Sequence, residues 1–501
     1  MGALRTKCRW REMSLYHWLD ERMDLTSIRR ALLDRPVPDR LTWWHTLGSS
    51  TLAVFAVQVV TGIVLATFYS PSPDHAYESV QYLQREVAGG PLLRGIHHWA
   101  ASAMVVLLLA HLIRVFAVGA YKYPREANWL VGVVLFVVVL GFSFTGYLLP
   151  WDQKAYWATT VGTNMAGITP GIGGFILSVL RGGGEIGAAT LTRFYAFHVL
   201  WLPAMLIGFV ALHLILVIRQ GIAALPRALE TGSPARTSDP AYPDYYRAAY
   251  AASKKGETSF YPDIVGKDIL VSTAVIGVIV LLAVVFGAPL EPPADPTDTA
   301  YVPSPEWYFL PLYQLLKLVP GSMESLVAVG VPTALIVSML ALPFYDRGST
   351  RNLLRRPVAL GALAFVLGGS GLLLGSAVRS MQPNAPPEGG RVLTSKERAG
   401  RALYRSQKCD DCHAIGGRGG DKGPELTEEG LRHSTAWLHS YIEQPSRFRG
   451  DTTEMPSFGP PSLSHEQIEQ LALYLGALRG KAGALVAPQY RDTFPEAERK
   501  R

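Results

Sequence analysis

Seven long apolar stretches alternate with polar segments along the first three quarters of the chain. They cover about residues 46–69, 97–118, 129–149, 196–218, 268–289, 327–345 and 358–379. Each is close to the 20 or so residues that an α-helix needs to cross the hydrocarbon core of a bilayer. The pattern predicts an all-α fold, a membrane helical bundle with four spans in residues 46–222 and three in residues 268–380.

The segments outside these stretches differ in composition. Residues 1–45 are rich in arginine and tryptophan, and their amphipathic pattern predicts a helix that lies on a membrane surface. Residues 223–267 are predicted to form a polar linker, and the Pro/Gly-rich residues 381–393 a tether. Residues 394–480 have the composition of a small soluble helical domain, which a loose tail follows at 481–501.

Positive charge predicts how the bundle is oriented. An odd number of spans puts the two ends of the bundle on opposite sides, and Lys and Arg concentrate on the side of the amino terminus. By the positive-inside rule, the amino terminus and the linker are cytoplasmic, and the soluble domain lies outside. This distribution accounts for the formal net charge of +7 without nucleic-acid binding.

Four histidines occur as two pairs within the apolar stretches. His97 and His111 are fourteen residues apart, and His198 and His213 are fifteen apart. These steps differ from whole helical turns by roughly −40° and +60°, so each pair shares one helix face, with about 21 to 23 Å between its members. Two such helices side by side would bring His97 opposite His198 and His111 opposite His213.

Intramembrane histidines also serve as proton relays or as helix contacts. Four of them at two matched depths favour axial ligation of two b-type haems. The predicted topology puts His97 and His198 near the outer face, and His111 and His213 near the inner face.

Glycines repeat the histidine spacing on two other spans. Gly48 and Gly62 are fourteen residues apart, as are Gly132 and Gly146. Glycine lets a flat macrocycle approach a helix backbone, where a side chain would collide with it. Small-residue helix packing would explain one such pair, but two pairs favour clearance for porphyrin.

The soluble domain carries a second redox motif. Cys409-Asp-Asp-Cys412-His413 has the spacing of a c-type haem attachment sequence, in which two thiols form thioethers and the histidine binds iron. A chance match and a zinc site are the alternatives, but a preceding helical segment and the later Met455-Pro456 argue against both. Bacteria attach haem c outside the cytoplasmic membrane, which agrees with the location expected from charge.

These motifs resemble a known family. The run TGYLLPWDQ at Thr145–Gln153, the four histidines and PEWY at Pro305–Tyr308 are similar to cytochrome b of the quinol:cytochrome c and plastocyanin reductases. The fifteen-residue histidine step resembles the cytochrome b6 branch, and the last three spans resemble its separate subunit IV. The soluble domain resembles class I cytochromes c, in which a methionine before proline is the distal ligand, which implies Met455.

The resemblance implies a quinol oxidation site on the outer side. Such a site needs a proton acceptor beside the quinol hydroxyl, and the resemblance gives that role to Glu306, with Tyr147 as a second catalytic candidate. It also implies a pocket lined by Pro305, Trp307, Tyr308, Pro150, Trp151 and Tyr156. Arg94 and Arg114 are candidates for pairing with haem propionates.

Cofactors and partners follow from the same resemblance. In the family, one quinol electron passes to a Rieske iron–sulfur protein, and the other crosses the membrane through two b haems, coupled to proton translocation. This implies two haem b, one covalent haem c, and quinol or quinone. It also implies a Rieske partner, because this sequence lacks the Cys/His pairs of such a cluster, a soluble or membrane cytochrome c acceptor, membrane lipid and a homodimer.

The sequence departs from cytochrome b6 in two respects. Thr46 occupies the position at which cytochrome b6 attaches an extra haem through cysteine, so that bond cannot form here. The haem c domain is foreign to the chloroplast protein, which indicates a bacterial complex in the cytoplasmic (inner) membrane.

Two other functions compete with this interpretation. A di-haem membrane anchor of a quinone-reducing dehydrogenase or hydrogenase shares the paired histidines but lacks PEWY. A proton-coupled transporter with a haem sensor domain would explain the spans and the Cys-x-x-Cys-His motif, but not the histidine pairs. We therefore predict the cytochrome b subunit, with fused cytochrome c, of a proton-translocating quinol:cytochrome c reductase.

Overall fold

The computed structural model describes residues 15–39, 41–256, 258–296, 301, 305–380, 393–416, 418–420, 422–449, 454–480, 489–490 and 492. Almost all of the tether and most of the tail lie outside these residues. The predicted all-α class is confirmed. Within the described residues, the only named strands are β1 (Ala414–Ile415) and β2 (Arg418–Gly419), which form one short antiparallel hairpin.

Seven helical segments among the described residues are long and apolar enough to cross a membrane, as predicted. They comprise η1 (Trp43–Thr46) with α3 (Leu47–Ala66), α5 (Gly90–Ala117), α6 (Glu126–Tyr147), α9 (Ala188–Ala196) with η2 (Phe197–Trp201) and α10 (Leu202–Gln220), η3 (Phe260–Ile264) with α13 (Val265–Phe286), η4 (Gly321–Met323) with η5 (Leu326–Gly330) and α15 (Val331–Tyr345), and α16 (Pro357–Ser380). The protein is therefore a multi-pass membrane protein.

Helix boundaries differ from prediction where polar residues continue a helix. The fourth and fifth spans begin at Ala188 and Phe260, ahead of the predicted starts, because hydropathy detects only the apolar part of a helix. The single predicted amino-terminal helix is two, α1 (Leu15–Met23) and α2 (Leu25–Leu32). Asp24 between them adopts a left-handed conformation with φ of 50°, which ends α1.

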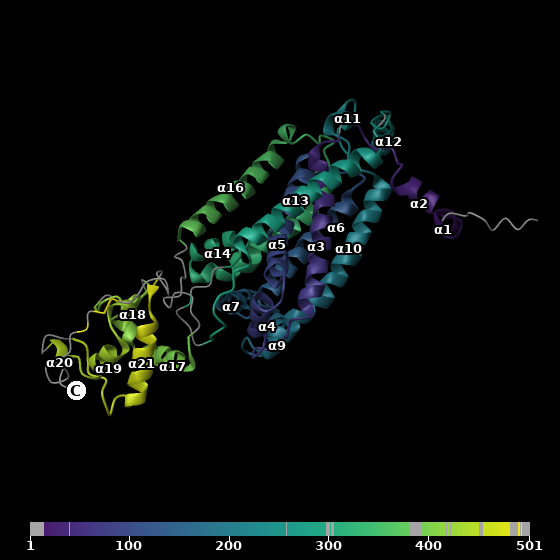
Figure 1. Cartoon of the computed structure of the whole chain (residues 1–501). Helices are drawn as coiled ribbons and strands as arrows, with labels where there is room; N and C mark the ends of the chain where they lie inside the picture. Colours follow the sequence, from purple (N-terminus) through teal and green to yellow (C-terminus); the bar gives the residue numbers. More distant parts are fainter. Residues whose placement is uncertain are drawn as a thin grey trace, which may run out of the picture. The chain divides into compact units, whose positions relative to one another are not determined.

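Two compact units divide the chain. The first comprises residues 1–149, 163–289 and 307–374, and the second comprises residues 150–162, 290–306 and 375–501. In the first, the long helices α3, α5, α6, α10 and α13 run side by side (Figure 1). Val54, Val105, Val139 and Leu206 belong to their common buried core.

Shorter helices connect the spans. They are α4 (Ala76–Arg85), α7 (Gln153–Gly167), α8 (Gly173–Arg181), α11 (Pro226–Glu230), α12 (Tyr242–Ala252), α14 (Leu310–Lys317) and η6 (Leu353–Arg355). Outward-facing apolar residues on the spans remain exposed, for example Val284 at 67% and Phe365 at 81%. Apolar exposure of this extent suits contact with lipid.

A buried ionic cluster joins the segment between α5 and α6 to the segment that follows α15. The Lys122 ammonium donates to Asp346 Oδ1 (2.8 Å) and to the carbonyls of Gly348 (2.7 Å) and Thr350 (2.8 Å). The Tyr121 hydroxyl donates to the other Asp346 oxygen. Burial opposes ionisation of Asp346, but these two donors outweigh it and lower the pKa of the carboxyl.

The second unit contains the soluble domain. Its first helix, α17 (Ser395–Ser406), packs against the last, α21 (His465–Ala477), which also contacts α19 (Thr435–Glu443). The short elements η7 (Cys409–Asp411), α18 (Glu429–Arg432) and α20 (Ser446–Arg449) complete the domain. Leu438, Ile468 and Leu471 lie in its buried core.

Candidate functional site

The structure brings the four transmembrane histidines together as two facing pairs. The ring centroids of His97 and His198 are 6.4 Å apart, with 71° between the ring planes. Those of His111 and His213 are 6.5 Å apart, with 72° between the planes. Metal–imidazole bonds of about 2.0 Å on both sides would separate two centroids by roughly 6 Å, so each pair fits one iron ion between its rings.

Each of the four predicted glycines faces one of these imidazoles. A Cβ added to Gly62 would lie 3.3 Å from His97 Cε1, and one added to Gly146 would lie 2.5 Å from His198 Cε1. In the same way, Gly48 approaches His111 at 3.2 Å and Gly132 approaches His213 at 3.8 Å.

This pairing gives the glycines a specific geometric role. The sequence suggested clearance for porphyrin, whereas the nearest described atoms are ring atoms of the histidines themselves. Each glycine therefore gives an imidazole space to lie close to the backbone of the neighbouring helix.

A π-helical turn accounts for the unequal histidine spacing. The segment η2 (Phe197–Trp201) is π-helical, and the Leu202 N–H donates to the Phe197 carbonyl. A π turn accommodates one residue more than an α turn, so the fifteen-residue step of His198 and His213 faces the fourteen-residue step of His97 and His111. A uniform α-helix, assumed from the sequence, could not reveal this adjustment.

Two threonines that the sequence analysis missed contact the first histidine pair. Thr61 Oγ1 lies 2.8 Å from His97 Nδ1, and Thr145 Oγ1 lies 3.2 Å from His198 Nδ1. Both threonines directly precede a predicted glycine, Gly62 and Gly146, and this repeated Thr-Gly pair was the available signal.

The two predicted propionate partners have different surroundings. The Arg94 guanidinium donates to the carbonyls of Ala288 and Pro289, both at 2.7 Å. Arg114, one turn beyond His111 in α5, has a buried Nε without a hydrogen-bond partner. Arg114 is therefore the better placed of the two to meet an added anion.

The loops that carry the predicted quinol residues are joined within the second unit. The Gln153 N–H donates to the Pro292 carbonyl (2.9 Å), and the Ala294 N–H donates to the Trp151 carbonyl (3.0 Å). The Asp152 carboxylate accepts from the Glu291 N–H at 3.0 Å. These bonds fix the segment after TGYLLP against the segment that leads to PEWY.

Glu306, the predicted proton acceptor, forms an ion pair. Its Oε1 lies 2.9 Å from Lys154 Nζ, and the two side chains are 20% and 29% exposed. Sequence reasoning did not identify Lys154 as its partner, because 152 positions separate the two residues. The nearby Glu291 accepts from the Tyr301 hydroxyl at 2.7 Å, and burial raises the pKa of this carboxyl.

The other predicted quinol-site residues are divided between the two units. Tyr147, at the end of α6, belongs to the first unit, as do Trp307 and Tyr308, which pack against the bundle core. The second contains Pro150, Trp151, Tyr156, Pro305 and Glu306. Trp151 has a left-handed backbone with φ of 52°, and its ring meets Tyr156 edge-on at 6.0 Å.

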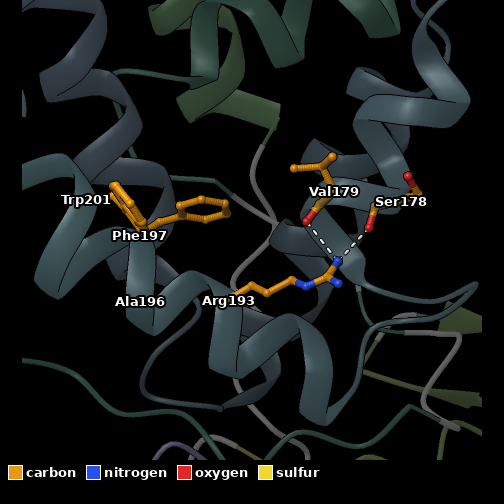
Figure 2. Close-up of a pocket in the computed structure, with 6 residues that line it drawn as sticks. All are labelled: Ser178, Val179, Arg193, Ala196, Phe197 and Trp201. Carbon is orange, nitrogen blue, oxygen red and sulfur yellow. Dashed lines mark hydrogen bonds between the residues drawn. The ribbon is translucent and has the colours of Figure 1, made fainter.

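A groove of about 450 Å³ lies beside the π turn. Figure 2 shows Arg193 of α9 reaching the carbonyls of Ser178 (2.6 Å) and Val179 (3.0 Å), with Phe197 and Trp201 of η2 nearby. Its lining includes none of the predicted quinol-site residues.

The c-type motif follows α17 in the soluble domain. Cys409 and Cys412 form no disulfide, and burial raises the pKa of the Cys409 thiol to about 11. His413 Nδ1 lies 2.9 Å from the Pro424 carbonyl, which leaves Nε2 for a metal. A Cβ on Gly423 would lie 2.5 Å from His413 Cε1, so a glycine faces the imidazole here as well.

Met455 is partly buried and packs against the hydrophobic core of this domain, which Cys409 also contacts. The soluble domain contains a further imidazole, that of His433. Its side chain is 19% exposed and stacks on Trp437 with centroids 3.7 Å apart. His433 also contacts Asp492 Oδ1 at 3.1 Å, so it already has structural partners.

Three family profiles match consecutive parts of the chain. The profile described as "Cytochrome b/b6/petB" matches residues 32–221, and "Cytochrome b(C-terminal)/b6/petD" matches residues 293–387. The soluble domain matches "Cytochrome C oxidase, cbb3-type, subunit III" over residues 395–475.

Relatives resemble the chain in its first part or in both membrane parts. A menaquinol:cytochrome c reductase cytochrome b subunit of Geobacillus thermodenitrificans is 48% identical over 217 residues, which are 42% of this chain and 97% of that protein. The cytochrome bc complex cytochrome b subunit of Chlorobaculum thiosulfatiphilum is 36% identical over 338 residues, 67% of this chain and 74% of that protein.

A solved structure extends the likeness to three dimensions. A chain described as "Hyperthermophilic respiratory Complex III" is similar with a TM-score of 0.62 and 28% sequence identity. The similarity covers 73% of this chain and 91% of that chain.

Proposed function

Since the chain belongs to the cytochrome b/b6 family, we propose that it is the cytochrome b subunit, with a fused cytochrome c domain, of a bacterial quinol:cytochrome c oxidoreductase. It oxidises quinol on the outer side of the cytoplasmic membrane and contributes to proton translocation. The proposal rests mainly on the two facing pairs of histidines in the bundle, whose ring centroids are 6.4 and 6.5 Å apart.

Four histidines of the bundle would hold two haem b groups. His97 and His198 would ligate one, and His111 and His213 would ligate the other, while each imidazole lies against its glycine. When bound, the two haems supply one-electron carriers at two depths of the membrane. Arg114, with its buried and unpartnered Nε, is suited to a propionate of the His111–His213 haem.

Residues of the outer loops would handle the quinol. The Glu306 carboxylate takes a proton from the quinol hydroxyl, since a general base must lie within hydrogen-bond reach of the proton it removes. The Lys154 ammonium, 2.9 Å away, keeps this carboxylate oriented when no quinol is present. Trp151 and Tyr156, which belong to the same unit as Glu306, contribute aromatic surface for the quinone ring.

The soluble domain would hold haem c on the outer side. Cys409 and Cys412 would form the thioethers, and His413 and Met455 would bind the iron. The Pro424 carbonyl fixes the His413 tautomer, and Gly423 keeps the space beside the ring.

The complex requires partners that this chain does not contain. We propose a Rieske iron–sulfur protein as first acceptor on the outer side, a soluble or membrane-bound cytochrome c as later acceptor, and a second copy of this chain as dimer partner. The amino terminus and the linker at 223–267 face the cytoplasm, in accordance with the positive charge of these segments.

Haem content tests the proposal. The full chain, purified from its membrane in mild detergent, should show b and c haem at a ratio of two to one in alkaline pyridine. Absence of b haem from a folded preparation would contradict the proposal. Identification of proteins that co-elute, with the Rieske protein as the expected one, tests the partner assignment.

A further inference from the structure

Hydroxyl groups distinguish the two histidine pairs. His97 and His198 each have a threonine oxygen next to Nδ1, at 2.8 Å from Thr61 and 3.2 Å from Thr145. The corresponding positions beside the His111–His213 pair, directly before Gly48 and Gly132, are Leu47 and Val131. Leucine and valine side chains offer no acceptor.

The direction of the two hydrogen bonds follows from what each hydroxyl already does. Thr61 Oγ1 donates to the Val57 carbonyl at 2.7 Å, and Thr145 Oγ1 donates to the Gly141 carbonyl at 2.9 Å. A hydroxyl has one proton, so toward the ring each oxygen is the acceptor and Nδ1–H is the donor. The backbone of Phe142 is a second acceptor for the His198 ring, so Thr145 shares this role, while Thr61 faces His97. Both rings are thereby held as the tautomer that presents Nε2 to a metal.

The other pair lacks this arrangement. His213 Nδ1 has no partner at regular hydrogen-bond geometry, and the acceptor that faces its ring is the backbone of Asn128, not a hydroxyl. The two sites therefore resemble each other in ring separation, 6.4 and 6.5 Å, but differ in what lies behind the ligand nitrogens.

We propose that Thr61 and Thr145 are positioning residues that fix the imidazoles of His97 and His198 and lower the reduction potential of the haem held there. The inference rests on the proposed haem ligation. A hydrogen bond accepted from the far ring nitrogen raises the basicity of a metal-ligating histidine. A more basic ligand stabilises the oxidised iron, so reduction of this haem becomes less favourable.

Replacement of each hydroxyl by a methyl group tests the inference. In Thr61→Val and Thr145→Val, alone and combined, we measure optical redox titrations of the b-haem absorbance and electron paramagnetic resonance of the oxidised protein. One of the two b-haem transitions should move to higher potential, the other should stay, and the resonance of one haem alone should change.

The expected size follows from the strength of a hydrogen bond. Loss of one bond should change the reduction equilibrium about threefold to tenfold, where tenfold corresponds to about 59 mV for one electron. The double variant should show the larger shift.

Two variants serve as controls. Thr51 lies on α3 like Thr61, but its hydroxyl donates only to the Leu47 carbonyl at 2.8 Å, so Thr51→Val should leave both potentials unchanged. Thr61→Ser keeps the acceptor oxygen and should restore the wild-type potential. If Thr61→Val loses its haem, Thr145→Val and Thr61→Ser still decide the question.

The inference and the proposed function fail in different ways. The role of the threonines would be overturned if two b haems are present and their potentials stay unchanged in both valine variants, shift together or fall. The proposed function would then still stand. An unmodified protein without b haem would overturn the proposed function, and this inference with it.

Discussion

The membrane bundle and the soluble domain both contain histidines suited to bind haem iron, but they assemble their sites differently. In the bundle, His97 and His198 come from helices a hundred residues apart, and each rests against a glycine of yet another helix. In the soluble domain, two cysteines and a histidine lie within five residues, and Gly423 follows after ten. The bundle site thus depends on helix packing, and the soluble site on local sequence and covalent attachment.

This difference predicts the largest contrast between the two regions. His111→Ala should remove one b haem completely, because a single remaining imidazole cannot hold the group in a helix bundle. Met455→Leu should leave haem c content unchanged, because two thioethers retain it, and should lower the potential of haem c, since a thioether ligand raises it. Pyridine haemochrome analysis of both variants makes the comparison, and loss of c haem from Met455→Leu would contradict it.

Quinol chemistry should belong to the membrane part alone. Glu306→Gln removes the proton acceptor and should slow quinol oxidation by about 10²-fold or more, with haem contents unchanged. Chemical reduction of the soluble domain by ascorbate should proceed as in wild type. Glu324→Gln, which changes an exposed carboxylate near the start of the sixth span, is the control. Equal rates in Glu306→Gln and wild type would favour a membrane anchor that reduces quinone.

Alanine substitutions at two of the glycines should show how strongly haem binding in the bundle depends on close helix packing. A Cβ at position 146 would lie 2.5 Å from His198 Cε1, whereas one at position 132 would lie 3.8 Å from His213 Cε1. Gly146→Ala should therefore displace its imidazole and reduce b-haem occupancy, while Gly132→Ala should retain both haems. Optical spectra of membranes from the two strains are sufficient, and equal occupancy in both would contradict the steric account.

The stability of the bundle should fall more at low pH than the stability of the soluble domain. The pKa of Asp346 is lowered in the folded protein. The ionised carboxylate therefore contributes to the free energy of unfolding above the ordinary carboxyl pKa, and this contribution is lost as pH falls through the lowered pKa. Asp346→Asn should destabilise the bundle by about 3 kcal/mol and weaken this pH dependence. Thermal unfolding followed by tryptophan fluorescence for the bundle, and by haem c absorbance for the soluble domain, separates the two regions.

The sequence predicted the features that recur at a fixed period or lie close together. Local sequence was sufficient to recognise the seven apolar stretches, the His97–His111 spacing and the Cys409–His413 motif. The predicted spans agree with the structure to within several residues. Asp24 breaks the amino-terminal helix without any composition signal, because a left-handed aspartate leaves the pattern of apolar residues intact.

The remaining features depend on contacts between distant segments. The Lys154–Glu306 ion pair, the Lys122–Asp346 cluster and the Thr145–His198 contact join residues 53 to 224 positions apart. No periodicity connects such positions. The π turn was present in the sequence only as one extra residue between His198 and His213, which does not reveal where the helix widens.

The central claim is that two pairs of imidazoles each hold one iron ion inside the bundle. Iron-specific anomalous diffraction, or a cryo-electron microscopy map of the purified complex, tests it most directly. The account predicts one iron midway between His97 and His198, a second between His111 and His213, and a third beside His413. Density in which the four transmembrane rings meet only protein or water would contradict it.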